Sequence, residues 1–374
     1  MSAIPVTSRR FGAAHRFKLG LFSFNHDGGL THTLAPARWA ATWDNTRALA
    51  QAAEAADLDF LLPLATWVGS AGDCPTDDWS FETLTWAAGL LAETSRIHVF
   101  ATVHAPFLNP VFAAKQCATC DHIGAGRFGL NVVAGYHKIE FAVHGVPYFD
   151  HDTRYAYLDE WLALVRRMWQ ARERFDFKGR FFDLKGVISA PPPYGGAQPI
   201  VVSAGSSPTG RAFALRAADA LFMLIPDLDT LADELVATRA AMAARPIDIY
   251  ASGHVICRRT AAETREYYRY LIEEHGDWRA GRNMRDAYAE IKSVPEAVYS
   301  SPAFLDRLMT GSGTFQVIGD PDHVVDTFAR IHAAGVNGMA IALPDYLADF
   351  EIIRDEVLPR MVARGLRVAE RAPA

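Results

Sequence analysis

Strand-like and helix-like segments alternate along almost the whole 374-residue chain, and this alternation limits the folds that it can adopt. Phe128–Val133 has the short apolar run of a buried strand, whereas Thr153–Trp169 carries apolar residues at the spacing of a helix with one buried face. The predicted strands are Phe17–Phe24, Phe60–Leu62, His98–Val103, Phe128–Val133, Ile200–Ser203, Ala220–Leu224, Ile249–Cys257 and Gly338–Leu343. The predicted helices are Trp39–Ala56, Trp79–Ala92, Pro110–Ile123, Thr153–Trp169, 207–217, Leu228–Ala244, Ala261–Glu274, Val324–Ala334 and Leu347–Arg364.

Regular alternation of strand and helix predicts an α/β fold with a parallel sheet. Eight such units suggest closure into a (β/α)8 TIM barrel, although counting strands leaves a doubly wound open sheet as an alternative. Barrels of this length often form one domain, so we expect residues 1–374 to form a single domain with insertions.

Two segments interrupt the alternation. Residues 172–199 contain Phe-Lys-Gly-Arg-Phe-Phe and a run of three prolines, which predicts a hairpin insertion followed by a stiff connection. Residues 276–316 are charged and glycine-rich with weak periodicity, and an insertion of this size predicts a lid loop.

Composition excludes several classes of function. A net charge of −6 gives no general attraction to phosphate backbones, so we expect no nucleic-acid partner. No apolar run approaches the roughly 18 residues of a membrane span, and the polar start lacks a signal peptide, so we expect a cytoplasmic enzyme. Cys117 and Cys120 form a lone C-x-x-C in a helical run, and we interpret them as two packed thiols rather than a redox pair or half a zinc site.

Polar and aromatic residues follow the predicted strands at their carboxyl ends, where the loops of a barrel converge on one mouth. The first strand is followed by Ser23, Asn25, His26 and Asp27, and the second by Ala65, Thr66 and Trp67. The third strand ends near Thr102 and His104, and the fourth near Asn131, Gly135, Tyr136 and Glu140. The fifth strand leads into Ser206 and Ser207, with Pro208 opening a helix. Free N–H groups and hydroxyls at the start of a helix can bind an anion. This loop is therefore interpreted either as a phosphate-binding site or as an ordinary helix cap.

Several histidines raise the alternative of a metal-dependent barrel hydrolase. His26, His104, His137, His144 and His151 all follow predicted strands. No H-x-H and no H-E-x-x-H spacing occurs in the chain, however, and without paired ligand spacing we predict no metal site.

Several motifs, in register over nearly the whole chain, resemble the bacterial luciferase-like flavin-dependent monooxygenases. The segment 126–140 is similar to the family's G-R-x-G-x-N-[VL]-V-[ST]-G motif with Glu nine residues after Asn. His151–Tyr155 resembles its D-x-R-Y motif, 200–210 its A-G-x-S segment, and Ser312–Gly319 a motif near its end. Among subgroups the chain looks closest to the pyrimidine and alkanesulfonate monooxygenases, with the pyrimidine type nearer. It departs from that type at Thr66, where a Lys is usual, and at Ala134, where Ser or Thr is usual.

The resemblance implies a set of site residues. Asn131 and Thr102 would line the pocket for dioxygen, where short polar groups stabilise developing negative charge. The residues themselves, apart from the resemblance, make His104 a candidate acid or base beside them and His26, Trp67 and Phe107 candidates for the substrate pocket. Residues matching the family's FMN contacts, together with the serine pair at the helix start, are Ala65, Thr66, Asn131, Glu140, Arg154, Tyr155, Ser206 and Ser207.

The resemblance also implies the reaction. Reduced FMN would come from a separate NAD(P)H-dependent flavin reductase, because no G-x-G-x-x-G fingerprint is present, and dioxygen would be the co-substrate. The substrate would be a small organic molecule of the heterocyclic or amide, sulfonate or sulfone class. We expect a homodimer or homotetramer. A non-catalytic flavin-binding protein and a deazaflavin-dependent relative remain alternatives to the monooxygenase.

Overall fold

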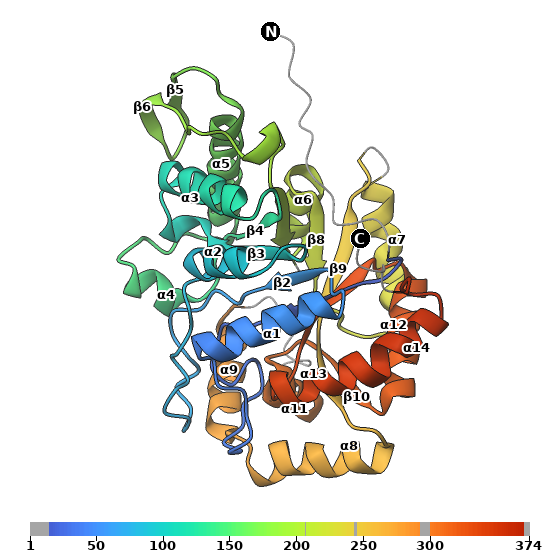
Figure 1. The fold of residues 1–374 in the computed structure, drawn as a ribbon. Coiled ribbons are helices and arrows are strands. Elements are labelled where there is room, and N and C mark those ends of the chain that lie inside the picture. Colours follow the sequence, from blue (N-terminus) through green and yellow to red (C-terminus); the bar gives the residue numbers. More distant parts are fainter. Residues whose placement is uncertain (1–14, 206, 243–244, 292–299, 370–374) are drawn as a thin grey trace.

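The computed structural model describes residues 15–205, 207–242, 245–291 and 300–369, and its centre is a closed barrel of parallel strands (Figure 1). Each barrel strand pairs with two neighbours, and β1 closes the ring by pairing with both β2 and β11. The open-sheet alternative is therefore excluded. In order around the barrel the strands are β1 (Lys18–Phe22), β2 (Phe60–Leu62), β3 (His98–His104), β4 (Phe128–Val133), β7 (Ile200–Ala204), β8 (Ala220–Met223), β9 (Asp248–Cys257) and β11 (Gly338–Ala342).

Helices surround the strands, as the predicted alternation requires (Figure 1). They are α1 (Trp43–Ala55), α2 (Thr83–Glu93), α3 (Pro110–Ile123), α4 (Lys138–Val143), α5 (His151–Gln170), α6 (Pro208–Ala217), α7 (Leu231–Ala241), α8 (Ala261–Tyr268), α12 (Pro321–Ala334), α13 (Tyr346–Ile352) and α14 (Leu358–Ala363). Shorter turns η1 (Ala105–Phe107) and η2 (Tyr194–Gly196) and the π-helices η3 (Arg269–Glu274) and η4 (Ile353–Val357) complete this layer.

Large aromatic side chains fill the lower interior of the barrel. The ring of Phe60 lies 6.1 Å from that of Phe100, 6.2 Å from Phe222 and 5.8 Å from Tyr250, measured between centroids. Gly129 leaves room for them, because a Cβ there would lie 2.3 Å from the Phe100 ring. The interior is thus a packed core, and only the rim at the carboxyl ends of the strands can hold a ligand.

The hairpin insertion consists of β5 (Phe175–Lys178) and β6 (Asp183–Val187), which pair antiparallel and lie beyond α5, far from α8 and α9 (Figure 1). The backbone N–H groups of Arg180, Phe181 and Phe182 donate to the Glu160 carboxylate on α5. The hairpin is therefore fastened to the outer helix layer and not to the mouth.

The prediction of a loop over 276–316 is wrong for its described part. Residues 278–291 form α9 (Trp278–Ile291), 302–311 form α11 (Pro302–Gly311), and the chain then enters β10 (Phe315–Gly319); residues 292–299 lie outside the described part. Strand β10 pairs with the outer half of β9, from Gly253 to Cys257, beyond the stretch that pairs with β8. The described part of the segment thus forms a wall of two helices and a strand.

Helix α9 is fastened to the connection that follows β2. Asp277 accepts a hydrogen bond from the backbone N–H of Ala280 in the first turn, and its other oxygen accepts from Asp73 at 2.7 Å and Cys74 at 2.9 Å. Asn283, one turn further on, donates to backbone carbonyls of the same connection. These bonds fix the wall against the rim.

No helix within the described ranges is long and apolar enough to cross a bilayer.

A buried ion pair locks the chain end to the bottom of the barrel. Arg367 donates to the Asp59 carboxylate at 2.7 Å, and the two side chains are only 3% and 7% exposed. We predict that Arg367→Met lowers the free energy of unfolding by about 3–5 kcal/mol, because it leaves a carboxylate buried without its partner. Urea denaturation measures this loss.

Arg364→Met is the matched control. Its partner, Asp326, lies 2.6 Å away, but both side chains are more than half exposed, so the loss should stay below about 1 kcal/mol. Equal losses in the two variants would contradict the prediction.

Candidate active site

Thr102 and Asn131 face each other across two neighbouring strands at the barrel rim. They are register partners on β3 and β4, and both are buried. The Asn131 Nδ2 donates to the Thr102 hydroxyl at 3.1 Å, and that hydroxyl donates to the Pro63 carbonyl at 2.7 Å. The single proton of the Thr102 hydroxyl goes to Pro63, so Thr102 has none to donate to Asn131. The Asn131 Oδ1 is buried without a hydrogen-bond partner.

His104 ends β3, two residues beyond Thr102 and therefore on the same inner face of the strand. Burial, together with the smaller effects of His144 and His137 nearby, lowers the pKa of His104 to about 4. The ring is therefore neutral near neutral pH, and its Nδ1 has no hydrogen-bond partner. As a neutral ring it can take part in a hydrogen bond without carrying a charge into the site.

An aromatic wall stands beside His104. The half-buried ring of Phe107 lies 5.1 Å from His104 and stacks on His144 at 4.1 Å with an interplanar angle of 6°. Trp67, which follows β2 and is 46% exposed, meets His144 edge-on at 4.8 Å. The structure thus brings Trp67 and Phe107 together through His144.

Glu140 binds the loop after β2. Its carboxylate accepts from the backbone N–H of Trp67 at 2.8 Å and lies 3.4 Å from the Thr66 hydroxyl. Burial raises the pKa of Glu140. This contact sets the position of Thr66 and its neighbour Ala65, which are both half-buried at the rim.

Two helix starts meet at another part of the rim. Ser207 caps α6 by accepting from the Gly210 N–H at 3.1 Å, and Tyr155, in the first turn of α5, hydrogen-bonds the Ser207 hydroxyl. A Cβ at Gly210 would lie 2.4 Å from the Tyr155 hydroxyl, so only glycine allows this approach. His151 also contacts Ser207, at 3.1 Å. Ser206 lies outside the described residues.

Arg154 is buried beside these helix starts. It donates to the Phe149 carbonyl at 2.6 Å, and its guanidinium lies 4.6 Å from the centroid of the Tyr148 ring. None of the ion pairs among the described residues involves it, and its Nε has no hydrogen-bond partner. A buried cation without a carboxylate partner is costly, and an anion at this place would offset that cost.

His26 lies on the connection after β1, where its backbone bridges to Ser80. Burial lowers the pKa of His26 to about 4, so this ring is also neutral. The contacts described for His26 do not join it to the aromatic wall, so the structure does not group the three predicted substrate residues directly.

His254 was missed by the sequence interpretation. It lies on β9, is fully buried, and has an Nδ1 without a hydrogen-bond partner. The available signal was a histidine inside the apolar run Ile249–Cys257, on the same face as the core residue Tyr250.

Several of the buried polar atoms that lack a hydrogen-bond partner among the described residues lie at this rim. Such atoms are rare in folded proteins, and a ligand with donors and acceptors of its own satisfies them. The rim atoms are Ser23 Oγ, His26 Nδ1, His104 Nδ1, Asn131 Oδ1, Arg154 Nε and His254 Nδ1. These residues fit a polar cofactor with an anionic end. Within the described ranges, no three His, Cys, Asp or Glu side chains form a group that could hold a metal ion.

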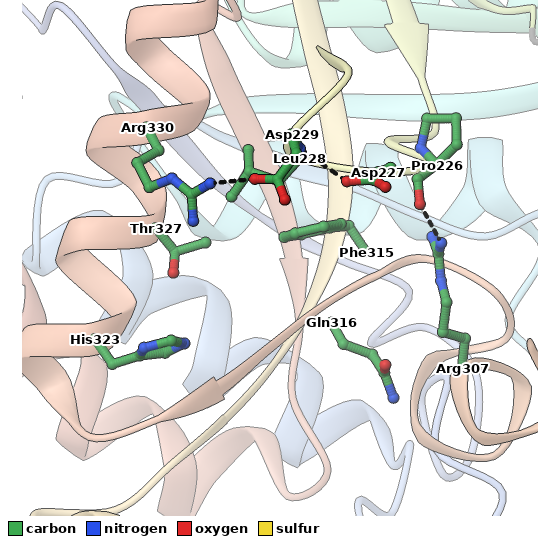
Figure 2. A pocket seen from close by; sticks show the side chains of 10 residues that line it. All are labelled: Pro226, Asp227, Leu228, Asp229, Arg307, Phe315, Gln316, His323, Thr327 and Arg330. Carbon is green, nitrogen blue, oxygen red and sulfur yellow. Dashed lines mark hydrogen bonds and ion pairs between the residues drawn. The ribbon is translucent and has the colours of Figure 1, made fainter. Parts of the chain in front are cut away.

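A separate hollow of about 380 Å³ lies between the loop after β8, β10 and α12 (Figure 2). Its two arginines are engaged: Arg330 pairs with Asp229 at 2.6 Å, and Arg307 donates to the Pro226 carbonyl at 2.8 Å. None of the site residues predicted from the sequence lines it.

The sequence model of the luciferase-like monooxygenases matches residues 17–338. The chain belongs to the luciferase-like monooxygenase family. The resemblance found in the motifs is thereby confirmed.

Relatives and solved structures agree with this membership. Pyrimidine monooxygenase RutA of a Bradyrhizobium species is 28% identical over 365 residues, covering 94% of this chain and 98% of the relative. The Escherichia coli protein of the same name is 30% identical over 362 residues, covering 93% and 90%. The structure of riboflavin lyase RcaE with modified FMN and riboflavin superposes with a TM-score of 0.83 at 22% identity, covering 96% and 94%, and shares the fold. The chain is thus a flavin-dependent monooxygenase, and its family uses reduced flavin and dioxygen.

The neutral His104 makes folding depend on pH. Because its folded pKa of about 4 lies below the ordinary value of 6.5, the unfolded chain takes up the proton first as pH falls. Stability is therefore lost as pH decreases from about 6.5 to about 4, and His104 alone should account for about 2 kcal/mol between about pH 7 and pH 5. We predict that His104→Phe makes the free energy of unfolding less dependent on pH over this window, measured by urea denaturation. An unchanged slope would show that His104 titrates alike in the folded and unfolded chain.

Proposed function

We propose that this protein is a two-component FMN-dependent monooxygenase, which uses reduced FMN and dioxygen to oxygenate a small heterocyclic or amide, sulfonate or sulfone substrate. The observation that carries the proposal is the meeting of buried Arg154 with the starts of α5 and α6. A fixed cation, two hydroxyls and free helix N–H groups suit a phosphate monoester.

The phosphate of FMN would bind at this meeting point. Tyr155 and Ser207 offer hydroxyls there, Arg154 neutralises charge, and Ser206 belongs to the same proposal. Ala65, Thr66 and Asn131 would border the ring system, with Glu140 holding the Thr66 backbone in place through the adjacent Trp67 N–H. FMN is the group that supplies two electrons to dioxygen, so that one oxygen atom enters the substrate and the other leaves as water.

Thr102, Asn131 and His104 would carry the catalytic work of the chain itself. The Asn131 Nδ2 donates one N–H to the Thr102 hydroxyl, which holds the amide in place, and its second N–H would stabilise negative charge as it develops on oxygen. His104, held neutral by burial, can move a proton at its Nδ1. Phe107 and its stacked neighbour keep water from this part of the rim.

The proposal places substrate against His26, Trp67 and Phe107. The relatives are named for pyrimidines, and this chain carries Thr66 where that type has a Lys, so its substrate need not be theirs. A separate NAD(P)H-dependent reductase would supply reduced FMN in the cytoplasm. The chain would assemble as a homodimer or homotetramer, and 276–316 would limit access to the mouth.

The Gly210 contact gives a test of the phosphate assignment. Gly210→Ala should displace the Tyr155 hydroxyl and raise the Kd for FMN about tenfold, measured by quenching of flavin fluorescence. In a Tyr155→Phe background the same change should cost less, because the clashing hydroxyl is already gone. An equal increase in the Kd for FMN in the two backgrounds would show that Tyr155 does not take part in binding the phosphate.

The reaction is tested with purified protein, FMN, NADH and a generic flavin reductase under oxygen-18, over a panel of heterocycles, amides, sulfonates and sulfones. Thr102→Ala and Asn131→Ala should each lower product formation about 100-fold, since each removes part of the polar pair. Thr264→Ala, a buried threonine on α8 whose hydroxyl donates to the Thr260 carbonyl and which is not among the proposed site residues, is the control and should keep full activity.

Label in a product confirms a monooxygenase that uses FMN. Activity restored only by a reduced deazaflavin would contradict the choice of cofactor. Full activity in both rim variants would show that the oxygen pocket lies elsewhere.

A further inference from the structure

His254 lies directly across the barrel from Thr102. In the closed ring, β9 is four strands from β3 in either direction, so the two strands face each other. His254 lies on the same face of β9 as Tyr250, which belongs to the interior cluster, and therefore points inward. It is fully buried in the half of β9 nearer the rim.

The hydrogen bonds around His254 fix its tautomer. Its Nε2 lies 3.3 Å from the Thr31 hydroxyl, and that hydroxyl donates to the Thr310 carbonyl at 3.2 Å. A hydroxyl has one proton, so Thr31 accepts from the Nε2–H of His254. Burial lowers the pKa of His254 to about 3, so the ring is neutral. In a neutral ring protonated at Nε2, Nδ1 carries a lone pair.

The ring has little freedom to turn. A Cβ at Gly311, the end of α11, would lie 2.5 Å from the His254 Cβ, so the helix backbone packs directly on this side chain. The next residue, Ser312, has a left-handed backbone with φ of 52°, and its hydroxyl donates to the Leu30 carbonyl at 3.1 Å. These contacts hold α11 and the connection after β1 around the histidine, which leaves Nδ1 as a fixed acceptor without a donor.

We propose that His254 is a specificity-determining residue that accepts a hydrogen bond from an N–H or O–H group of the substrate. The inference rests on the proposed function and narrows its substrate class. Lactams, amides and heterocycles with a ring N–H carry the required donor, whereas sulfones and ionised sulfonates carry none. The proposed flavin phosphate site lies at the starts of α5 and α6, which follow β4 and β7, so it leaves the β9 side of the mouth free for a substrate that reaches across from Trp67 and Phe107.

The tautomer is tested directly by nitrogen-15 NMR of histidine-labelled holoenzyme, with the His254 signals assigned by their loss in His254→Gln. We expect an unprotonated Nδ1 and a protonated Nε2. A protonated Nδ1 would overturn the proposal whatever the activity of the enzyme.

The substrate class is tested with compounds that differ only in the donor: uracil and its N,N′-dimethyl derivative, and pyrrolidinone and N-methylpyrrolidinone, beside dimethyl sulfone and methanesulfonate. With reduced FMN and oxygen-18, product should form only from compounds with an N–H. A donor-free compound with an equal or higher kcat/KM would overturn this inference and leave the monooxygenase standing. Label in no product at all would overturn the proposed function and, with it, this inference.

The residue is tested on whichever compound is oxidised. His254→Phe should raise KM at least about tenfold with little change in kcat, whereas His254→Gln, which keeps an acceptor, should recover part of the affinity. The Kd for FMN should not move in either variant. A raised Kd for FMN with an unchanged KM would assign the ring to the cofactor and overturn the proposal.

Two further variants separate recognition from folding. His332→Phe makes the same exchange on α12, where the ring packs on Phe17 in the outer layer, and should leave KM unchanged. Thr31→Val keeps the histidine but removes the acceptor that fixes its tautomer. It should raise KM by a smaller factor, even if His254→Phe fails to fold; an unchanged KM would contradict the hydrogen-bonding argument.

Discussion

Closure of the strands into a ring is the constraint on which the other features of this molecule depend. Once β1 pairs with β11, each barrel side chain points either into the barrel or toward the surrounding helices. The interior is filled at its lower level by Phe60, Phe100, Phe222 and Tyr250. Polar groups on inward positions can therefore gather only at the carboxyl rim, and a histidine or asparagine there is poorly explained by packing alone. The site follows from the geometry of the sheet as much as from the identity of its residues.

Much of the fold could be predicted, because local signals and tertiary structure agree. The bounds of α3 match the prediction, since Asn109 caps the helix and Pro110 fits its first turn. Trp39 and Trp79 were assigned to helices that begin later, at Trp43 and Thr83, directly after the capping side chains of Thr42 and Glu82. The wall of α9 and α11 was missed because its helices pack on loops and on each other. Both helices carry an apolar face, but the contacts of Asp277 that fix the wall reach residues about two hundred positions away in sequence.

The candidate site was predicted in part, and mostly through motifs. The pairing of Thr102 with Asn131 follows from strand register, which neighbouring parallel strands make predictable in outline. The contact between Glu140 and the Trp67 backbone joins two loops, and no local pattern signals it. Asp150 and Asp159 lie close to Arg154 in the sequence, but neither pairs with it. Asp150 instead caps α5 and Asp159 binds Arg216, which leaves the guanidinium for another anion. Which carboxylate pairs with which arginine depends on how close the side chains lie in the folded protein, and the sequence does not give this.

The ring of strands also divides the rim between two stretches of the gene. The residues of the proposed flavin site lie between 65 and 210, whereas His254 and the helices that support it come from the later part of the chain, joined to the earlier part by the β1–β11 seam. Substitutions in the later stretch can therefore change the hydrogen bond that His254 is proposed to accept while Thr102 and Asn131 on β3 and β4 are inherited unchanged. Evolution of this one substrate contact is thus separable from evolution of the proposed flavin site.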